Sequence, residues 1–387
     1  MAKGILLVSE VFPPAIGGSG TLLENIYRRM PERHVRVLAD GSALEMPPYE
    51  GPLDVKRVVM SGADWGVIRP SSFGRHLRVA SAIRAALASE PAIVHCARAL
   101  PEGLSAAMAL AGRGDRYVCW LHGEELGYAS SSRELTWLAR RVYQRAVAVI
   151  ANSNNSARLL VRDWGVPESR VHVVYPGVDT ERFRPDVDGR AMRARVASDD
   201  DVLLLSVGRL QRRKGHDMVL RALARIRLAV PNVRYVIVGD GPHQARLEAD
   251  AAELGVTDIV DFVGPASEAD LPAWYAAADV FVMPNRSDGV DFEGFGIVFL
   301  EAAAAGLPVI GGRSGGVPEA VEDRVTGRLV DGTDVTAIER AILEMATSSE
   351  VRQECGRAGR ARAVQRFSWE RAVFDVQHVC STTSSPE

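Results

Sequence analysis

The sequence predicts an α/β protein built from two doubly wound domains, and three observations support this fold class. Short apolar runs alternate with helix-length segments along almost the whole chain, which is typical of parallel sheets covered by helices. A proline-containing segment without periodicity, residues 175–185, interrupts this alternation near the middle. With 387 residues, the chain is also too long for one ordinary core.

The first half contains seven runs of strand length. We expect them to form one sheet, at residues 4–8, 35–39, 55–60, 93–95, 117–121, 147–151 and 171–174. Expected helices between them include residues 21–30, 73–89, 103–111, 134–145 and 153–164.

After residues 175–185, which we interpret as an interdomain linker, the alternation restarts. The expected strands are residues 202–207, 233–238, 259–263, 280–283, 308–310 and 327–330. The expected helices run over about 214–228, 244–254, 268–277, 297–305 and 317–322. We therefore expect an N-terminal domain over residues 1–183 and a C-terminal domain over 184–366, facing a central cleft, with ligands at the carboxyl ends of the strands.

Net charge, cysteine content and the length of apolar runs bear on the partners and the cellular location of the protein. The net charge of −3 does not favour a nucleic-acid partner. Residues 1–150 carry +4 and the remainder −7, so the first half either faces an acidic acceptor or anionic membrane, or simply has a solvated surface. Four scattered cysteines and the absence of a signal peptide or a membrane-length apolar run favour a cytoplasmic protein, peripheral to a membrane at most.

Three glycine-rich loops follow strands and open helices. They are residues 13–20, which include Gly17 and Gly18, residues 293–296, and residues 311–318. Glycines let a ligand approach the backbone, and a helix N-terminus offers free N–H groups to an anion. A tight turn without a ligand is the alternative for the first loop.

Two carboxylates flank the second loop. Glu293 lies just before the helix that begins near Ile297, and Glu301 lies inside it. Gly294, Phe295 and Gly296 separate Glu293 from the helix. This arrangement suits a sugar diphosphate, since the glycines can take the pyrophosphate while the carboxylates meet ribose and sugar hydroxyls.

Positive charge comes from residues 208–215. Arg209 can contact two phosphate oxygens, and Lys214 can act as a mobile point charge. Lys214 is one of only three lysines in a chain that otherwise uses arginine, although a solvated face would also explain it. His122 follows an apolar strand in the first half beside Gly123 and two carboxylates, and is either structural or catalytic.

The sequence lacks the motifs of two other classes of nucleotide-binding enzyme. A dinucleotide-dependent oxidoreductase predicts Gly-x-Gly-x-x-Gly after a strand, and this pattern occurs nowhere in the chain. A P-loop kinase needs Gly-Lys-Ser/Thr, which is also missing.

Taken in order, these motifs resemble glycosyltransferase family 4, the large retaining GT-B family. The similarity runs over nearly the whole chain and includes Gly17-Gly18, His122-Gly123, Asn152-Ser153, the Pro176–Pro185 linker, Arg209 to Lys214, Gly239-Asp240-Gly241, the Glu293 and Glu301 pair, and Gly315-Gly316.

The resemblance implies a role for each candidate. Arg209 and Lys214 would neutralise the donor diphosphate, helped by the N–H groups of Gly17, Gly18 and residues Phe295, Gly296 and Ile297. Glu301 would bind the ribose, Glu293 the sugar hydroxyls, and His122 the transferred sugar or developing positive charge. Gly264 and Pro265 would lie at the nucleotide base. A last helix, residues 367–380, would pack back on the N-terminal domain. The resemblance implies no cofactor and no metal.

The resemblance also bears on the substrates. The loop from Pro284 to Glu293 looks like that of bacterial mannosyltransferases acting on phosphatidylinositol mannosides, which typically use GDP-mannose. We therefore expect hexose transfer from a nucleotide sugar, with GDP-mannose favoured, to a lipid-linked, polysaccharide or small-molecule hydroxyl. The alternatives are a UDP-sugar transferase for glucose or N-acetylglucosamine, a non-catalytic sugar-nucleotide-binding protein, and, less favoured, a phosphorylase.

The helix expected at residues 73–89 is a candidate for membrane contact. Arg75, Arg78 and Arg84 alternate there with apolar residues, so this helix could rest on anionic lipid. A solvated arginine face over an ordinary core is the other interpretation.

Overall fold

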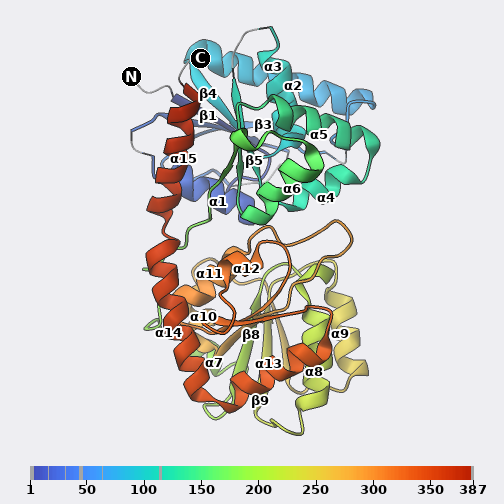
Figure 1. The fold of residues 1–387 in the computed structure, drawn as a ribbon, viewed down its shortest axis with the longest axis vertical. Helices are drawn as coiled ribbons and strands as arrows, with labels where there is room; N and C mark the ends of the chain where they lie inside the picture. The colour runs from blue at the N-terminus through green and yellow to red at the C-terminus, as the bar shows by residue number, and fades with distance from the viewer. Residues whose placement is uncertain are drawn as a thin grey trace. The chain divides into compact units, whose positions relative to one another are not determined.

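A computed structural model describes residues 4–15, 17–30, 32–42, 47–62, 64–112 and 116–384. The chain divides into two units, residues 1–176 with 369–387 and residues 177–368. The first unit ends seven residues before the boundary expected from the sequence. Each unit contains one parallel sheet with helices packed on it, so both are Rossmann-like, as expected (Figure 1).

The sheet of the first unit has seven parallel strands in the order β3-β2-β1-β4-β5-β6-β7. They are β1 (Gly4–Ser9), β2 (Val35–Asp40), β3 (Asp54–Val58), β4 (Ala92–Cys96), β5 (Tyr117–Leu121), β6 (Ala148–Ala151) and β7 (Val171–Val173). The central strands are buried almost throughout, which explains why they are continuous apolar runs in the sequence.

The helices of the first unit follow the strands in sequence. They are α1 (Gly18–Tyr27), α2 (Pro70–Ser89), η1 (Ala99–Gly103), α3 (Leu104–Leu110), α4 (Glu124–Ser130), α5 (Arg133–Arg145), α6 (Asn154–Trp164), η2 (Glu168–Arg170) and α15 (Trp369–Ser384). The C-terminal helix α15 belongs to this unit and packs against α1. It begins two residues after, and ends four residues after, the helix expected at 367–380.

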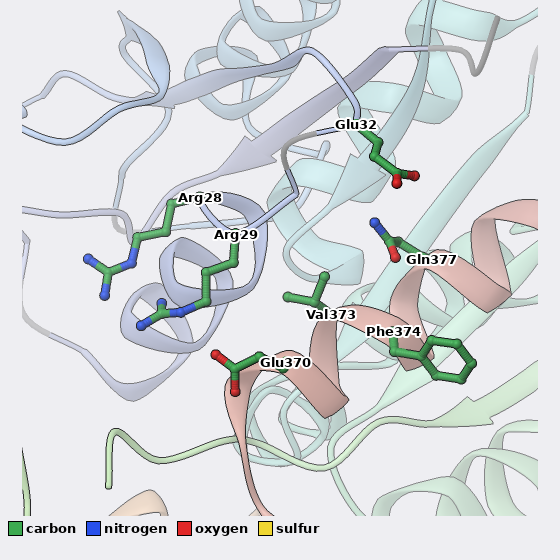
Figure 2. A pocket seen from close by; sticks show the side chains of 7 residues that line it. All are labelled: Arg28, Arg29, Glu32, Glu370, Val373, Phe374 and Gln377. Atoms are coloured by element: carbon green, nitrogen blue, oxygen red, sulfur yellow. The ribbon is translucent and has the colours of Figure 1, made fainter. Parts of the chain in front are cut away.

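An open groove of about 550 Å³ lies between α1 and α15 (Figure 2). Its lining includes Arg28, Arg29 and Phe374. Because the two arginines follow the C-terminal end of α1, the groove is at the opposite end of that helix from Gly17 and Gly18. We therefore assign it no part in donor binding.

The second unit has six parallel strands in the order β10-β9-β8-β11-β12-β13. They are β8 (Val202–Val207), β9 (Val233–Val238), β10 (Val260–Gly264), β11 (Val280–Met283), β12 (Val309–Gly312) and β13 (Gly327–Val330). The order reverses between β8 and β11, and ligands of doubly wound sheets bind at such a switch point. The loops after β8 and β11 are those that carry Arg209, Lys214 and Glu293.

The helices of the second unit are α7 (Arg190–Arg193), η3 (Arg212–Lys214), α8 (His216–Ile226), α9 (Gln244–Glu253), α10 (Leu271–Ala277), α11 (Ile297–Ala304), α12 (Val317–Ala320), α13 (Val335–Thr347) and α14 (Ser349–Arg366). In the described part of the chain, no helix is both long and apolar enough to cross a membrane. The four cysteines are buried and free.

Candidate active site

Glu293 is the centre of a buried charged cluster in the second unit. Its Oε2 accepts hydrogen bonds from Lys214 Nζ at 2.6 Å, from Arg213 Nη1 at 2.8 Å and from Asn285 Nδ2 at 2.8 Å. Burial alone would raise the pKa of this carboxyl, but the two cations outweigh burial and lower the pKa to about 2. Glu293 is therefore a permanently ionised acceptor, and Oε1 remains free of hydrogen bonds to the described residues.

Glycines allow the loops around Glu293 to pack closely. Gly315 has a φ of 58°, and a Cβ there would lie 2.0 Å from the carbonyl oxygen of Glu293. Gly215 has a φ of 81°, and a Cβ there would lie 2.3 Å from the carbonyl oxygen of Pro284. Side chains at these positions would be strained and would clash with backbone. The glycines thus hold the loops after β8, β11 and β12 against one another.

The two predicted cations occupy different environments. Lys214 ends the short helix η3 and is buried against Glu293. Arg209, three residues before η3, is exposed, and its side chain has no hydrogen bond or ion pair with the residues that the structure describes. The structure therefore brings Lys214 and Glu293 together and leaves the Arg209 guanidinium available to an anion.

The N-terminus of α11 has the features of an anion site. Its N-cap is Gly296, with a φ of 89° and no side-chain hydrogen bond to the first turn. The N–H groups that open this helix, beginning at Ile297, are thus not capped by a side chain. Gly294 and Phe295 precede it, and the buried Phe295 ring packs on Phe367 with centroids 5.9 Å apart.

Glu301 lies one turn into α11 and has a different electrostatic environment from Glu293. Its Oε2 accepts a hydrogen bond of 2.7 Å from the hydroxyl of Tyr275. Burial raises the pKa of Glu301 to about 7, an effect that this hydrogen bond only partly offsets. The two carboxylates on either side of the α11 N-terminus therefore differ in proton affinity.

Gly264 and Pro265 lie at the carboxyl end of β10, the edge strand of the second sheet. Gly264 accepts a backbone hydrogen bond of 2.8 Å from Gly239 at the end of the neighbouring strand β9. Pro265 is exposed, and a Cβ on Gly264 would meet nothing within 4 Å. The structure thus leaves open space beside this pair, two strands away from β8.

His122 follows β5 in the first unit and is held on both sides. Its ring stacks on Trp120 at an interplanar angle of 2°, and its backbone N–H donates to Glu125 Oε1 at 2.7 Å. Burial and the charge of Arg98 lower the pKa of His122 to about 3. Nε2 lies 3.0 Å from the carbonyl oxygen of Ala97, which can only accept. The proton of the neutral ring is therefore on Nε2, and Nδ1 is an acceptor.

Gly17 and Gly18 lie where the loop after β1 meets α1. Gly17 is the N-cap of α1 and provides no side-chain hydrogen bond to the helix. A Cβ on Gly18 would meet nothing within 4 Å. The preceding loop residue Ile16 lies outside the described residues. The two glycines thus form a second uncapped helix N-terminus, at the edge of the first sheet that also carries His122.

Sequence reasoning missed three residues of these sites. Arg213 and Asn285 bind Glu293 directly, and Tyr275 binds Glu301. The sequence offered a clue to Arg213, which adjoins Lys214, and to Asn285, which lies in the loop after β11. It offered no clue to Tyr275, because only packing brings α10 to α11.

Comparisons with known proteins identify the class of protein. Residues 189–362 match the family model of glycosyl transferases group 1, and residues 16–182 match that of glycosyltransferase family 4. The solved structures of HepE from Anabaena with UDP and glucose (TM-score 0.82, 22% identity, 98% of this chain and 100% of that chain) and of sucrose-phosphate synthase from Thermosynechococcus elongatus (TM-score 0.82, 23% identity, 98% of each chain) share the fold.

The most informative relatives are mannosyltransferases. The chain is 36% identical over 372 residues to the GDP-mannose-dependent alpha-(1-6)-phosphatidylinositol monomannoside mannosyltransferase of Mycolicibacterium smegmatis, covering 94% of this chain and 95% of the relative. A D-inositol 3-phosphate glycosyltransferase of Thermobifida fusca is 37% identical over 251 residues, or 61% of this chain and 56% of the relative. The chain therefore belongs to glycosyltransferase family 4 and is a GT-B hexosyltransferase.

Proposed function

We propose that this enzyme transfers a hexose, with mannose from GDP-mannose favoured, to an acceptor hydroxyl with retention of the anomeric configuration and without a metal ion. The observation that carries the proposal is Glu293. Its Oε2 is occupied by three buried donors, so Oε1 is left to accept from sugar hydroxyls. The relatives' dependence on GDP-mannose supports this choice of donor.

Diphosphate binding in this proposal uses protein groups alone. Arg209 has an exposed guanidinium without a protein partner among the described residues, and it can contact two phosphate oxygens. The uncapped N-terminus of α11 adds N–H donors and a positive dipole end. Lys214 adds a buried cation. These fixed charges stabilise the leaving diphosphate as its negative charge develops.

We propose front-face substitution for the chemical step. The bond from the anomeric carbon to the phosphate oxygen breaks, and a bond to the acceptor oxygen forms on the same face. The departing phosphate oxygen receives the acceptor proton. The ionised Glu293 and the neutral His122, whose Nδ1 is an acceptor, are suited to hydrogen bonds with sugar hydroxyls. A double displacement would need a carboxylate nucleophile about 5 Å from the acid, and family resemblance supplies none.

A lipid-linked acceptor is the favoured choice in this proposal, because the relatives act on phosphatidylinositol monomannoside. Helix α2 supports contact with a membrane. It exposes Phe73 by 43% and Leu77 by 48%, and Ile68 just before it is 77% exposed. Arg78 of the same helix has no ion pair with the described residues. Apolar side chains beside arginine suit an anionic bilayer surface.

A UDP-sugar donor remains the second candidate, since HepE, a protein with the same fold, was solved with UDP and glucose. Slow donor hydrolysis without acceptor distinguishes the two donors. The enzyme is incubated with GDP-mannose, UDP-glucose, UDP-N-acetylglucosamine and ADP-glucose in EDTA. We expect the fastest hydrolysis with GDP-mannose. Faster hydrolysis of a UDP-sugar would overturn the choice of donor, and strict dependence on a divalent ion would overturn the metal-free site.

Sedimentation with vesicles tests the membrane contact. We expect the protein to sediment with vesicles that contain phosphatidylglycerol and to remain in solution with pure phosphatidylcholine. Replacing Phe73 and Leu77 by serine should abolish sedimentation, whereas Leu228→Ser, which changes a 92% exposed residue of the second unit, should not. Equal sedimentation of all these proteins would contradict a role for α2.

A further inference from the structure

Tyr275 of α10 fixes the position of Glu301. Its hydroxyl donates a hydrogen bond of 2.7 Å to Glu301 Oε2. Its ring is fully buried, stacks on Phe281 at a centroid distance of 5.9 Å, and meets Phe183 edge-on at 5.4 Å. Because aromatic contacts hold the ring on two sides, the hydroxyl has a fixed direction, and so does the carboxyl that it binds.

Phe183 brings the start of the second unit, part of the segment interpreted from the sequence as a linker, into the same cluster. Residues 179–183 form a compact turn in which the N–H of Phe183 donates to the carbonyl oxygen of Asp179 at 2.9 Å. The guanidinium of the adjacent Arg182 lies over the Phe183 ring at 4.9 Å and donates to Glu268 Oε2 at 2.8 Å. The linker turn thus packs on the residue that positions Glu301.

Arg360 of α14 joins the same turn to the far end of α11. Three carbonyl oxygens share the two N–H groups of its Nη1, those of Thr180 at 2.9 Å, Phe183 at 2.9 Å and Ala304 at 2.8 Å. Ala304 is the last residue of α11, and a cation at the C-terminal end of a helix is favourable. The linker turn is therefore attached to α11 both at Glu301, through Tyr275, and at the helix end.

We propose that Tyr275 is a positioning residue for donor binding, which holds the Glu301 carboxyl for the ribose and couples ribose binding to the linker turn at residues 179–183. This rests on the proposed function, in which Glu301 accepts hydrogen bonds from the ribose hydroxyls. Neither Tyr275 nor the linker turn touches the reacting atoms. Their contribution is to keep the acceptor oxygens of Glu301 in place and to make the linker respond to an occupied donor site.

The charges around Glu301 predict how binding depends on pH. Tyr275 of α10 bonds it directly, and the charges of Glu268 before α10 and of Arg182 also act on its pKa. Burial, assisted by Glu268, raises the pKa of Glu301 to about 7, while Tyr275 and Arg182 oppose the rise. The ionised carboxylate accepts through both oxygens, whereas the protonated carboxyl uses one of them as a donor, so nucleotide affinity should increase as pH rises through about 7. Loss of the Tyr275 hydroxyl should move this increase to higher pH.

The variant Tyr275→Phe tests the proposal. Its binding of GDP and of 2′,3′-dideoxy-GDP is measured by calorimetric titration, with UDP and its dideoxy analogue in parallel. This change removes one hydroxyl and keeps the ring. We expect roughly 10- to 140-fold weaker binding of the nucleotide with a complete ribose, the range for losing one hydrogen bond to a charged group. Binding of the dideoxy analogue should be unchanged, because it has no hydroxyls for Glu301.

The outcomes separate this inference from the proposed function. Equal weakening of both nucleotides, or no weakening of either, overturns the role of Tyr275. If the wild-type enzyme binds no nucleoside diphosphate, or does not distinguish the ribose from the dideoxyribose, the proposed function fails instead. Tyr117→Phe is the matched control, because it removes a buried hydroxyl that bonds the Val142 carbonyl oxygen at 2.6 Å in the first unit. It should bind both nucleotides as the wild type does.

Hydrogen exchange measures the coupling to the linker. In the wild type, GDP should slow amide exchange in residues 179–183 at least several-fold. In Tyr275→Phe, saturated with GDP, this protection should be largely lost. If GDP does not slow amide exchange of residues 179–183 in the wild type, the proposed coupling is wrong.

Discussion

Glu293 keeps its negative charge in a buried site because two cations and an amide converge on one of its oxygens. Removing a single partner from a buried ion pair is costly, since the remaining charge cannot be solvated. Here Arg213 and Lys214 would both lose their shared carboxylate. In the proposed function, Glu293 therefore maintains the packing of the donor site and also contacts the sugar.

Replacing Glu293 by glutamine tests this double role. The amide keeps the shape but removes the charge, so Lys214 and Arg213 repel each other and the sugar loses an ionised acceptor. We expect donor hydrolysis to fall at least about 100-fold, comparable to the loss of one preorganised polar group in other enzymes. Initial rates with saturating donor measure the change.

Asp291→Asn is the matched control for this variant. Asp291 also pairs with Arg213, at 3.2 Å, but its side chain is 42% exposed. Solvent screens exposed pairs, so turnover should change less than about threefold. Wild-type turnover in Glu293→Gln would show that the central site assignment is wrong.

His122 leads to a prediction about protonation. Because burial and the nearby Arg98 lower its pKa to about 3, the ring should be neutral from pH 5 to pH 8, with its proton on Nε2. Nitrogen-15 NMR of the imidazole should show this single tautomer across the range. A titration with a midpoint near 6.5, the value of an unperturbed histidine, would contradict the geometry described for His122.

At the scale of elements, the donor loops depend on glycines that admit neighbouring backbone. Gly315→Ala combines a positive φ with a Cβ 2.0 Å from the Glu293 carbonyl oxygen. Gly289→Ala has a similar φ of 63° but meets nothing within 4 Å. We expect the first change to lower the free energy of unfolding by more than 2 kcal/mol and the second by about 1 kcal/mol. Urea unfolding measures both, and equal losses would contradict the close packing of these loops.

Strands were easier to predict than helices. Each of the thirteen strands of the described residues overlaps an expected one, because central parallel strands are continuous apolar runs. Four α-helices, α4, α7, α13 and α14, were not assigned. Helices α4 and α7 have only seven and four residues. Helix α14 is mostly polar, and instead of an apolar stripe it buries Gly359 against Ala303 of α11 and Gly356 against Gly306 just beyond α11. Helix α13 buries Ile338, Ile342 and Met345, whose helical spacing is a sequence pattern typical of an amphipathic helix.

At the scale of the whole molecule, the sequence predicted which loops and helices carry the candidate residues but not the contacts between them. Arg213 and Glu293 are 80 residues apart, and Tyr275 and Glu301 are 26 apart. Motif spacing assigns such residues to particular helices and loops of one sheet, whereas packing decides which atoms meet. For the same reason, the sequence of the N-terminal unit identifies His122, Gly17 and Gly18 as candidate residues. It does not identify the residues that would bind the acceptor.

The enzyme as a whole is proposed to retain the configuration of the transferred sugar, and one measurement tests this most directly. The product formed from GDP-mannose in the presence of EDTA, with a lipid-linked or simple mannoside acceptor, is analysed by NMR through the one-bond coupling of the anomeric carbon and its proton. We expect an α-linked mannose, as in the donor. A β-linked product would show inversion and would contradict the proposed mechanism.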